Sequence, residues 1–256
     1  MSSARQPNDS ALFEYLLRLG DDRLILGHRL SEWCGHGPVL EEDIALANVA
    51  LDLVGQAANF LRLAGTVEGK GRDEDTLAYF RDAIEYRNAK LVELPNGDYG
   101  RTIVRQFLFD AWSVLLLERL QQSSHVELAG IAAKAYKEAR YHVRHSGEWL
   151  LRLGDGTEES HRRAQTALDE LWPYTGELLM ADEIDKQLAG TILPASAELA
   201  SAWRDAVGDV IRRATLTQPA DGHMHSGGRQ GRHTEHLGHA LDEMQILARS
   251  HPGAKW

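Results

Sequence analysis

The sequence is poor in cysteine, in proline and in basic charge. It has a single cysteine, Cys34, among 256 residues, so no disulfide can form within the chain, which fits a reducing compartment. We expect Cys34 to be a buried structural thiol, because only His36 lies beside it as a possible base. Seven prolines and 23 glycines are too few for a fibrous or disordered chain.

Acidic residues outnumber basic ones by 38 to 28, and the formal net charge is -10. This balance disfavours nucleic acid as a partner, because binding to phosphates requires clustered lysines and arginines. The first ten residues are polar and lack the apolar segment of a signal peptide. We also expect no membrane partner, because no apolar run approaches the roughly 20 residues of a membrane span. These features predict a cytoplasmic protein.

Apolar residues recur with the period of an α-helix along most of the chain, which predicts an all-α protein. Long helices are expected at about 10–34, 40–65, 100–122 and 124–153, and shorter ones near 74–90, 158–190, 196–216 and 232–250. Short connections between long helices are typical of antiparallel pairs in a bundle. We predict a single domain over residues 1–256, with its least ordered parts at 68–74 and 218–231.

Polar side chains interrupt an apolar face in each of the four long predicted helices. In the range 124–153, steps of three and four residues define one face: Leu128, Ile131, Ala135, Glu138, His142, His145 and Trp149. In the range 100–122, the face contains Ile103, Phe107, Asp110, Val114 and Leu117. The polar residues in the other two ranges are Asn48, Asp52, Gln56 and Asn59, and Asp21, His28 and Glu32. Buried carboxylates and imidazoles are costly unless they are paired or bind a metal.

Two interpretations of these polar residues compete. Bundles that bind two iron ions use a Glu from each of two helices and a Glu-x-x-His pair from each of the other two. Alternatively, the same groups form a buried polar network that needs no metal. Asp52 is followed three residues later by Gly55, and Glu138 by Tyr141, with His142 one residue too far. The missing histidines favour the second interpretation.

The residues therefore predict a vestigial metal site, with no catalytic, metal-binding or cofactor-binding residue in this chain. The vestigial positions are Asp52, Gly55, Asp110, Glu138, Tyr141 and His142. We expect Glu138 to be buried and paired with a histidine or arginine of a facing helix, because it lies between Ala135 and His142.

Four long and distinctive segments carry a family resemblance. They are LSEWCGHGPVLEEDIALANVALDLVGQAANF (30–60), LPNGDYGRTIVRQFLFDAW (94–112), KEARYHVRHSGEWLLRLGDGT (137–157) and GRQGRHTEHLGHALDEMQ (228–245). These segments resemble the C-subunit family of the bacterial phenylacetyl-CoA ring epoxidase, which is a multicomponent di-iron monooxygenase. The resemblance covers nearly the whole chain, and only the first ten residues and about 185–227 match loosely.

The resemblance implies a ferritin-like helical bundle with additional C-terminal helices and no working metal site. Such a subunit is not catalytic by itself; it supports a related catalytic A subunit that holds the di-iron cofactor and binds the CoA thioester. A reductase and small accessory subunits complete the implied NADPH- and O2-dependent monooxygenase complex, which epoxidises the ring of phenylacetyl-CoA in aerobic phenylacetate degradation. The alternatives are a stand-alone ferritin-like di-metal oxidase and an unrelated helical binding module.

A histidine-rich segment near the C-terminus is a second candidate metal site. Its members are His233, His236 and His239, with His223 and His225 just upstream. Their spacing differs from His-Glu-x-x-His, so we favour a structural role in which Thr234 or a neighbour caps a helix, with adventitious zinc or nickel binding as the alternative. Gly227-Gly228 and Arg229 could meet a phosphate, but no strand precedes them.

Paired arginines and scattered tryptophans have simpler explanations. We expect Arg162-Arg163 and Arg212-Arg213 to lie on solvated helix faces. We expect the tryptophans in apolar helical stretches to be core or interface anchors: Trp33, Trp112, Trp149 and Trp172.

Overall fold

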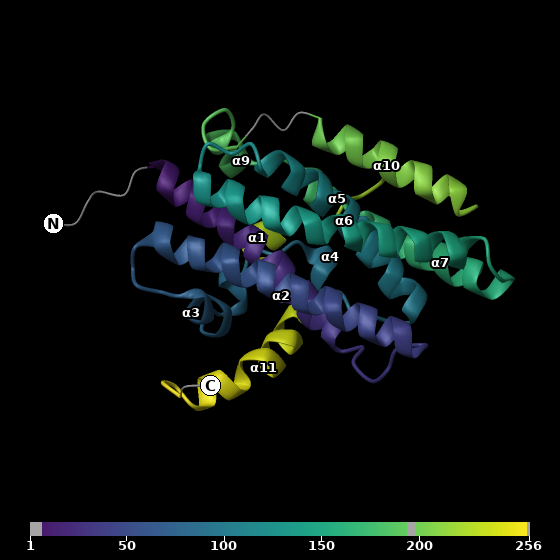
Figure 1. Ribbon diagram of the computed structural model, residues 1–256, viewed down its shortest axis with the longest axis horizontal. Helices are drawn as coiled ribbons and strands as arrows, with labels where there is room; N and C mark the ends of the chain where they lie inside the picture. Colours follow the sequence, from purple (N-terminus) through teal and green to yellow (C-terminus); the bar gives the residue numbers. More distant parts are fainter. Residues whose placement is uncertain (1–6, 194–197, 255–256) are drawn as a thin grey trace. The chain divides into compact units, whose positions relative to one another are not determined.

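The computed structural model describes residues 7–193 and 198–254, and these residues form helices joined by turns and loops (Figure 1). The longest helices are α1 (Pro7–Ser31), α2 (Leu40–Glu68), α5 (Tyr99–Leu120) and α6 (Val126–Gly154). The shorter helices are α3 (Glu74–Tyr79), η1 (Ala83–Glu85), α4 (Lys90–Glu93), α7 (Glu158–Leu171), η2 (Trp172–Tyr174), α8 (Gly176–Leu179), α9 (Glu183–Leu188), α10 (Leu199–Arg213), η3 (Gly228–Gln230) and α11 (Glu235–Ser250). The described part contains no β-strand, only one isolated bridge between Ala189 and Leu193. The predicted all-α class is confirmed.

Side chains at the first turn fix where several helices begin. The carboxylate of Asp73 accepts a hydrogen bond from the Thr76 backbone N–H at 2.8 Å, and that of Asp98 accepts one from the Arg101 N–H at 2.8 Å. These bonds satisfy N–H groups that have no partner inside a helix. At its other end, α2 stops at Gly69, which adopts a left-handed conformation with φ of 68°. Each long helix begins and ends within three residues of its predicted bounds.

The prediction of one continuous helix over 74–90 is wrong. Only α3 and η1 form there, and α4 begins at the last residue of that range. The backbone N–H of Arg87 donates to Asp21 Oδ2 at 2.8 Å, and that of Ala89 donates to Asp22 Oδ1 at 2.7 Å. Because these N–H groups bind carboxylates of α1, they cannot take part in a regular helix.

The prediction of one continuous helix over 158–190 is also wrong. The range is divided into α7, η2, α8 and α9. Pro173 is the second residue after α7, in η2, and proline has no N–H to donate within a helix. The Pro173 carbonyl instead accepts a hydrogen bond from the His225 N–H at 2.8 Å, so the break is used by a distant part of the chain.

The chain falls into two compact units, each made from several segments. Unit 1 comprises Met1–Pro95, Ala181–Leu188 and Gly227–Trp256, and unit 2 comprises Asn96–Met180 and Ala189–Ser226. Each unit contains one pair of long helices, α1 with α2 in unit 1 and α5 with α6 in unit 2, as a ferritin-like bundle requires. The prediction of a single domain stays a prediction.

The α1–α2 pair is antiparallel and closely packed. A Cβ at Gly20 would lie 2.7 Å from Leu61 Cδ2, whereas one at Gly27 would lie 3.0 Å from Val54 Cγ2. Residue numbers therefore rise along α1 from Gly20 to Gly27 while those of the contacting α2 residues fall from Leu61 to Val54, so the two helices are antiparallel. In α5 and α6 the contacts run the same way, since Phe107 meets Gly147 while Glu118 Oε1 accepts a hydrogen bond from Tyr136 at 3.2 Å.

Helix α2 corrects the expectation that no apolar run approaches a membrane span. It contains an 18-residue window with a mean hydropathy of 1.4, so it meets the length and composition criteria for crossing a membrane. The core helix of a water-soluble protein meets the same criteria, and 44% of this window is buried. One such helix is weak support for a membrane role.

The expectation of a buried thiol at Cys34 is wrong. Helix α1 ends at Ser31, three residues before the predicted end, and the chain then turns. Cys34 lies exposed in this turn, and its carbonyl oxygen lies 3.0 Å from Nδ1 of His36.

We predict opposite effects from adding one methyl group at two glycines of α2. In Gly65→Ala the new Cβ would lie 2.0 Å from the Arg72 carbonyl oxygen, so the connection after α2 must shift, at a cost of roughly 1–3 kcal/mol. In Gly55→Ala, no atom lies within 4 Å of the new Cβ, and alanine favours the helix by up to about 1 kcal/mol. Urea unfolding of both variants measures this difference; equal midpoints would contradict the close approach at Gly65.

Candidate functional site

The polar centre of unit 2 is the buried carboxylate of Asp110 on α5. Gln106, one turn earlier on the same helix, donates from Nε2 to Asp110 Oδ1 at 2.7 Å. Ser146 of α6 donates from Oγ to Asp110 Oδ2 at 2.9 Å. The i to i+4 spacing of Gln106 and Asp110 brings their side chains together. The prediction that Asp110 faces the core is confirmed.

Burial raises the pKa of Asp110 to about 6. The nearby imidazole of His142 and the hydrogen bonds from Ser146 and Gln106 act in the opposite direction, and His145 adds a smaller effect of the same sign. Loss of hydration outweighs these contributions, because a carboxylate removed from water is favoured in its neutral form. Asp110 therefore changes its charge close to neutral pH.

The buried face of α6 differs from the predicted one. It contains Leu128, Ala132, Ala135, Ala139, His142, Ser146 and Leu150. The prediction that Glu138 is buried is wrong, because Ala139 takes the core position between Ala135 and His142 and Glu138 is half-buried. Steps of three and four residues fit two neighbouring faces of α6, one through Glu138 and one through Ala139. The buried face is the one that carries Ala132, Ala135 and Ala139.

Tyr141, the residue in place of a motif histidine, lies on the exposed side of α6. Its ring stacks on that of His145 at 6.1 Å and meets the ring of His142 edge-on at 6.3 Å. Three predicted positions of unit 2 thus differ in environment: Asp110 and His142 are buried, whereas Tyr141 is exposed.

The predicted polar residues of unit 1 are similarly divided. On α2, Gln56 is buried and its Oε1 accepts a hydrogen bond from Arg23 Nε at 2.9 Å, whereas Asp52 is half-buried and Gly55 exposed. Asp21 on α1 is buried, whereas Glu32, in the turn after α1, is exposed. Of the other predicted polar residues, His28 and Asn59 are half-buried and Asn48 is exposed.

The donor set around Asp110 does not fit a pair of iron ions. Both of its oxygens accept hydrogen bonds from the neutral side chains of Gln106 and Ser146, which are poor ligands for iron. Over residues 7–193 and 198–254, no group of three or more His, Cys, Asp or Glu side chains could hold a metal ion. The absence of a bound metal and the vestigial nature of these positions stay predictions.

A second polar centre, in unit 1, was not predicted from the sequence. Asp22 of α1 is buried, and both of its oxygens accept hydrogen bonds from the guanidinium of Arg229, at 2.9 and 2.8 Å. Arg229 also donates to the Arg87 carbonyl oxygen at 2.8 Å. Arg229, considered above as a phosphate contact, therefore neutralises a buried carboxylate. The signal in the sequence is the run of charges Asp21-Asp22-Arg23 inside an apolar helix.

Glu93 on α4 also uses both of its carboxylate oxygens, and its partners belong to the histidine-rich segment. Its Oε2 lies 2.8 Å from Nδ1 of His233, and its Oε1 accepts a hydrogen bond from the Thr234 N–H at 2.6 Å. The other ring nitrogen of His233 lies 3.1 Å from the Tyr86 carbonyl oxygen. The structural role of His233 is confirmed, because neither nitrogen is free for a metal. Thr234 caps α11 by position, but its hydroxyl makes no capping bond.

The other histidines and the tryptophans have packing roles or lie near the surface. His225 stacks on Tyr174 at 4.3 Å, with His223 edge-on at 5.4 Å. Trp112 and Trp172 are buried core residues, as expected, and Trp33 and Trp149 are half-buried. The arginine pairs lie on exposed faces as predicted, and they form ion pairs: Arg162 and Arg163 with Glu159, and Arg212 and Arg213 with Asp209.

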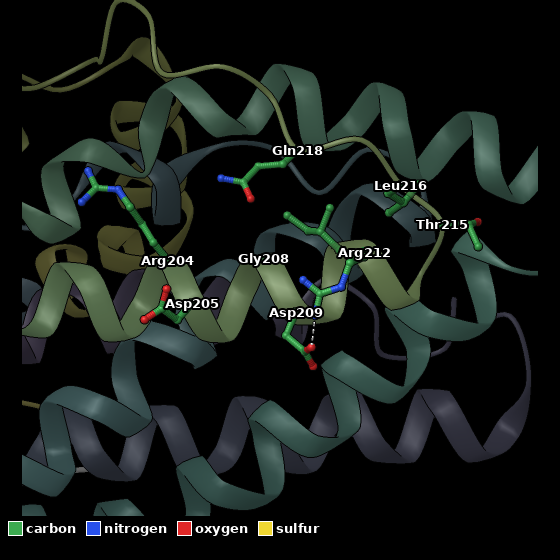
Figure 2. A pocket seen from close by; sticks show the side chains of 9 residues that line it. Arg204, Asp205, Gly208, Asp209, Arg212, Thr215, Leu216 and Gln218 are labelled. Carbon is green, nitrogen blue, oxygen red and sulfur yellow. Dashed lines mark hydrogen bonds and ion pairs between the residues drawn. The ribbon is translucent and has the colours of Figure 1, made fainter.

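A surface cavity of about 510 Å³ lies beside α10 (Figure 2). The charged side chains in its wall are Arg204, Asp205, Asp209 and Arg212. Two arginines and two aspartates balance each other, and Arg212 is already paired with Asp209. This cavity therefore offers no excess charge of either sign to a ligand.

Comparison with known protein families identifies the family to which this chain belongs. A model of the family described as "Phenylacetic acid catabolic protein" matches residues 2–256. The chain belongs to this family. It is also 51% identical over 246 residues to the C subunit of 1,2-phenylacetyl-CoA epoxidase from Escherichia coli (strain K12), a match that covers 96% of this chain and 99% of that protein. The resemblance noted in four sequence segments is confirmed.

In this phenylacetic acid catabolic protein, we expect Asp110→Asn to alter how stability depends on pH. The pKa of Asp110 is raised from its ordinary value of 3.8 to about 6 in the folded chain, so stability falls as pH rises from about 3.8 to about 6 and then stays level. Asparagine cannot ionise, so the variant should gain on wild type by up to roughly 3 kcal/mol between pH 4 and 7.5. Urea unfolding at both pH values measures the gain; a pH-independent difference would contradict it.

We expect Arg229→Met to destabilise the chain strongly, because it leaves Asp22 buried and without its charged partner. Losing one member of a buried ion pair typically costs about 3–5 kcal/mol. Arg232→Met is the matched control, because Arg232 belongs to the same segment and is exposed. Thermal and urea unfolding compare the two; similar losses in both variants would show that the pair with Asp22 is unimportant.

Proposed function

We propose that this chain is the non-catalytic structural subunit of a multicomponent di-iron monooxygenase that epoxidises the ring of phenylacetyl-CoA. Its 51% identity to the C subunit of the bacterial epoxidase carries this proposal. In this role the chain pairs with a catalytic A subunit and supports the helices of that partner. A reductase and small accessory subunits complete the complex, and we expect it to act in the cytoplasm.

The composition of the long helices supports a non-catalytic role. Residues 40–68 of α2 contain no histidine, and the only carboxylate buried on α5 is held by Gln106 and Ser146. The iron-binding Glu-x-x-His pairs of di-iron bundles have no equivalent on α2 or α6, where Gly55 and Tyr141 follow the carboxylates. We therefore assign the di-iron cofactor to the catalytic partner and no cofactor to this chain.

The alternative, a stand-alone ferritin-like di-metal oxidase, needs a set of ligands in this chain. The side chains around Asp110 do not supply it, since Gln106 and Ser146 are poor ligands for iron. Within the proposed complex, the same residues have a simpler role. They satisfy the buried carboxylate and hold α5 and α6 in register.

Reconstitution tests the proposal. The catalytic A subunit and the reductase are assayed for NADPH-dependent epoxidation of phenylacetyl-CoA with and without this chain. We expect full activity only when the chain is present, and no activity from the chain and reductase alone. Equal activity in both mixtures would refute the supporting role, and turnover by the chain with reductase alone would restore the stand-alone oxidase.

A further inference from the structure

Helix α2 carries an apolar seam of exposed and half-buried side chains. The seam residues recur at alternating steps of four and three: Leu40, Ile44, Ala47, Leu51, Val54 and Ala58. The side chains of Leu40, Ile44 and Leu51 are 72%, 53% and 70% exposed, although leucine and isoleucine are usually buried in a folded protein. This spacing is the one with which helices pack side by side in bundles and coiled coils. The seam extends along the helix for about 27 Å.

Gly55 lies beside the seam, and its backbone carbonyl accepts a hydrogen bond from Asn59 Nδ2 at 2.9 Å. A Cβ at this position would meet no atom within 4 Å, and its backbone is that of a regular helix. Glycine in an exposed helix interior lowers helix stability relative to alanine. A close approach by the backbone of a second helix accounts for a residue without a side chain at this position.

The charged residues of α2 between Leu40 and Ala58 are all acidic. Glu41 is exposed, and Asp43 and Asp52 on the two sides of the helix are half-buried. A second copy of this chain would bring the same acidic flank and another net charge of -10 to the interface. Like charges opposed across an interface are unfavourable, so the complementary surface is apolar with basic borders.

We infer that the seam Leu40–Ala58 of α2 is the docking site for a long helix of the catalytic partner, whose apolar stripe is bordered by lysine or arginine. The inference rests on the proposed function, because that function supplies the catalytic partner. Apolar side chains of the seam contribute the central contacts, and Glu41 and its neighbours contribute charge complementarity at the border. Gly55 is the point of closest approach between the two helices.

Binding of the purified catalytic partner to the purified full-length chain tests this inference. Two variants block the seam: Leu51→Glu adds a charge, and Gly55→Leu adds bulk in open space. Ile246→Glu is the matched control, because Ile246 of α11 is 65% exposed and lies outside α2. Far-UV circular dichroism melts establish folding, and the melting temperature of Gly55→Leu should equal or exceed that of wild type, because its side chain meets no atom of the chain.

We expect both seam variants to weaken binding by at least about ten-fold, with no change for Ile246→Glu. Binding should also weaken as salt is raised, and Glu41→Gln should reduce that dependence. Unchanged affinity of Gly55→Leu and Leu51→Glu, or an equal loss in Ile246→Glu, would overturn the docking site while the proposed function stands. Loss of self-association in the seam variants with intact binding to the catalytic partner would identify a second copy instead. Failure of wild type to bind would refute the proposed function itself.

Discussion

A buried charge requires a partner, and this requirement governs how unit 1 is assembled. Three consecutive charged residues, Asp21, Asp22 and Arg23, are fully buried in the middle of α1. Unpaired, each would cost several kcal/mol or more, so the surrounding chain has to supply opposite charges and hydrogen bonds. Arg81 pairs with Asp21, Arg229 with Asp22, and Gln56 accepts a hydrogen bond from Arg23.

The same requirement explains why two stretches of unit 1 are irregular. The connection between η1 and α4 gives up helical hydrogen bonds so that its N–H groups reach α1. The segment before α11 places Arg229 on α1 and His233 on Glu93, with Gly227 and Gly231 in left-handed conformations that permit its turns. Irregular backbone is therefore the means by which distant residues neutralise buried charges.

Local patterns in the sequence predicted the features that depend on residues close to one another in the chain. The period of apolar residues located the four long helices and the core position of Asp110. Partners 60 or more residues away, such as Arg81 for Asp21, leave no local pattern, so the breaks near residue 80 could not be foreseen. For Glu138 the failure was one of register, because two adjacent helical stripes share Ala135 and His142.

The pair between Asp22 and Arg229 joins residues separated by 207 positions. Synthesis at about 5–20 residues per second therefore leaves Asp22 without its guanidinium for roughly 10–40 s after it is made. During that interval α1 can form, but its charged centre has to remain hydrated or be shielded by other molecules. Neutralisation of Asp22 therefore has to wait until residue 229 has been made, although α1 can form long before then.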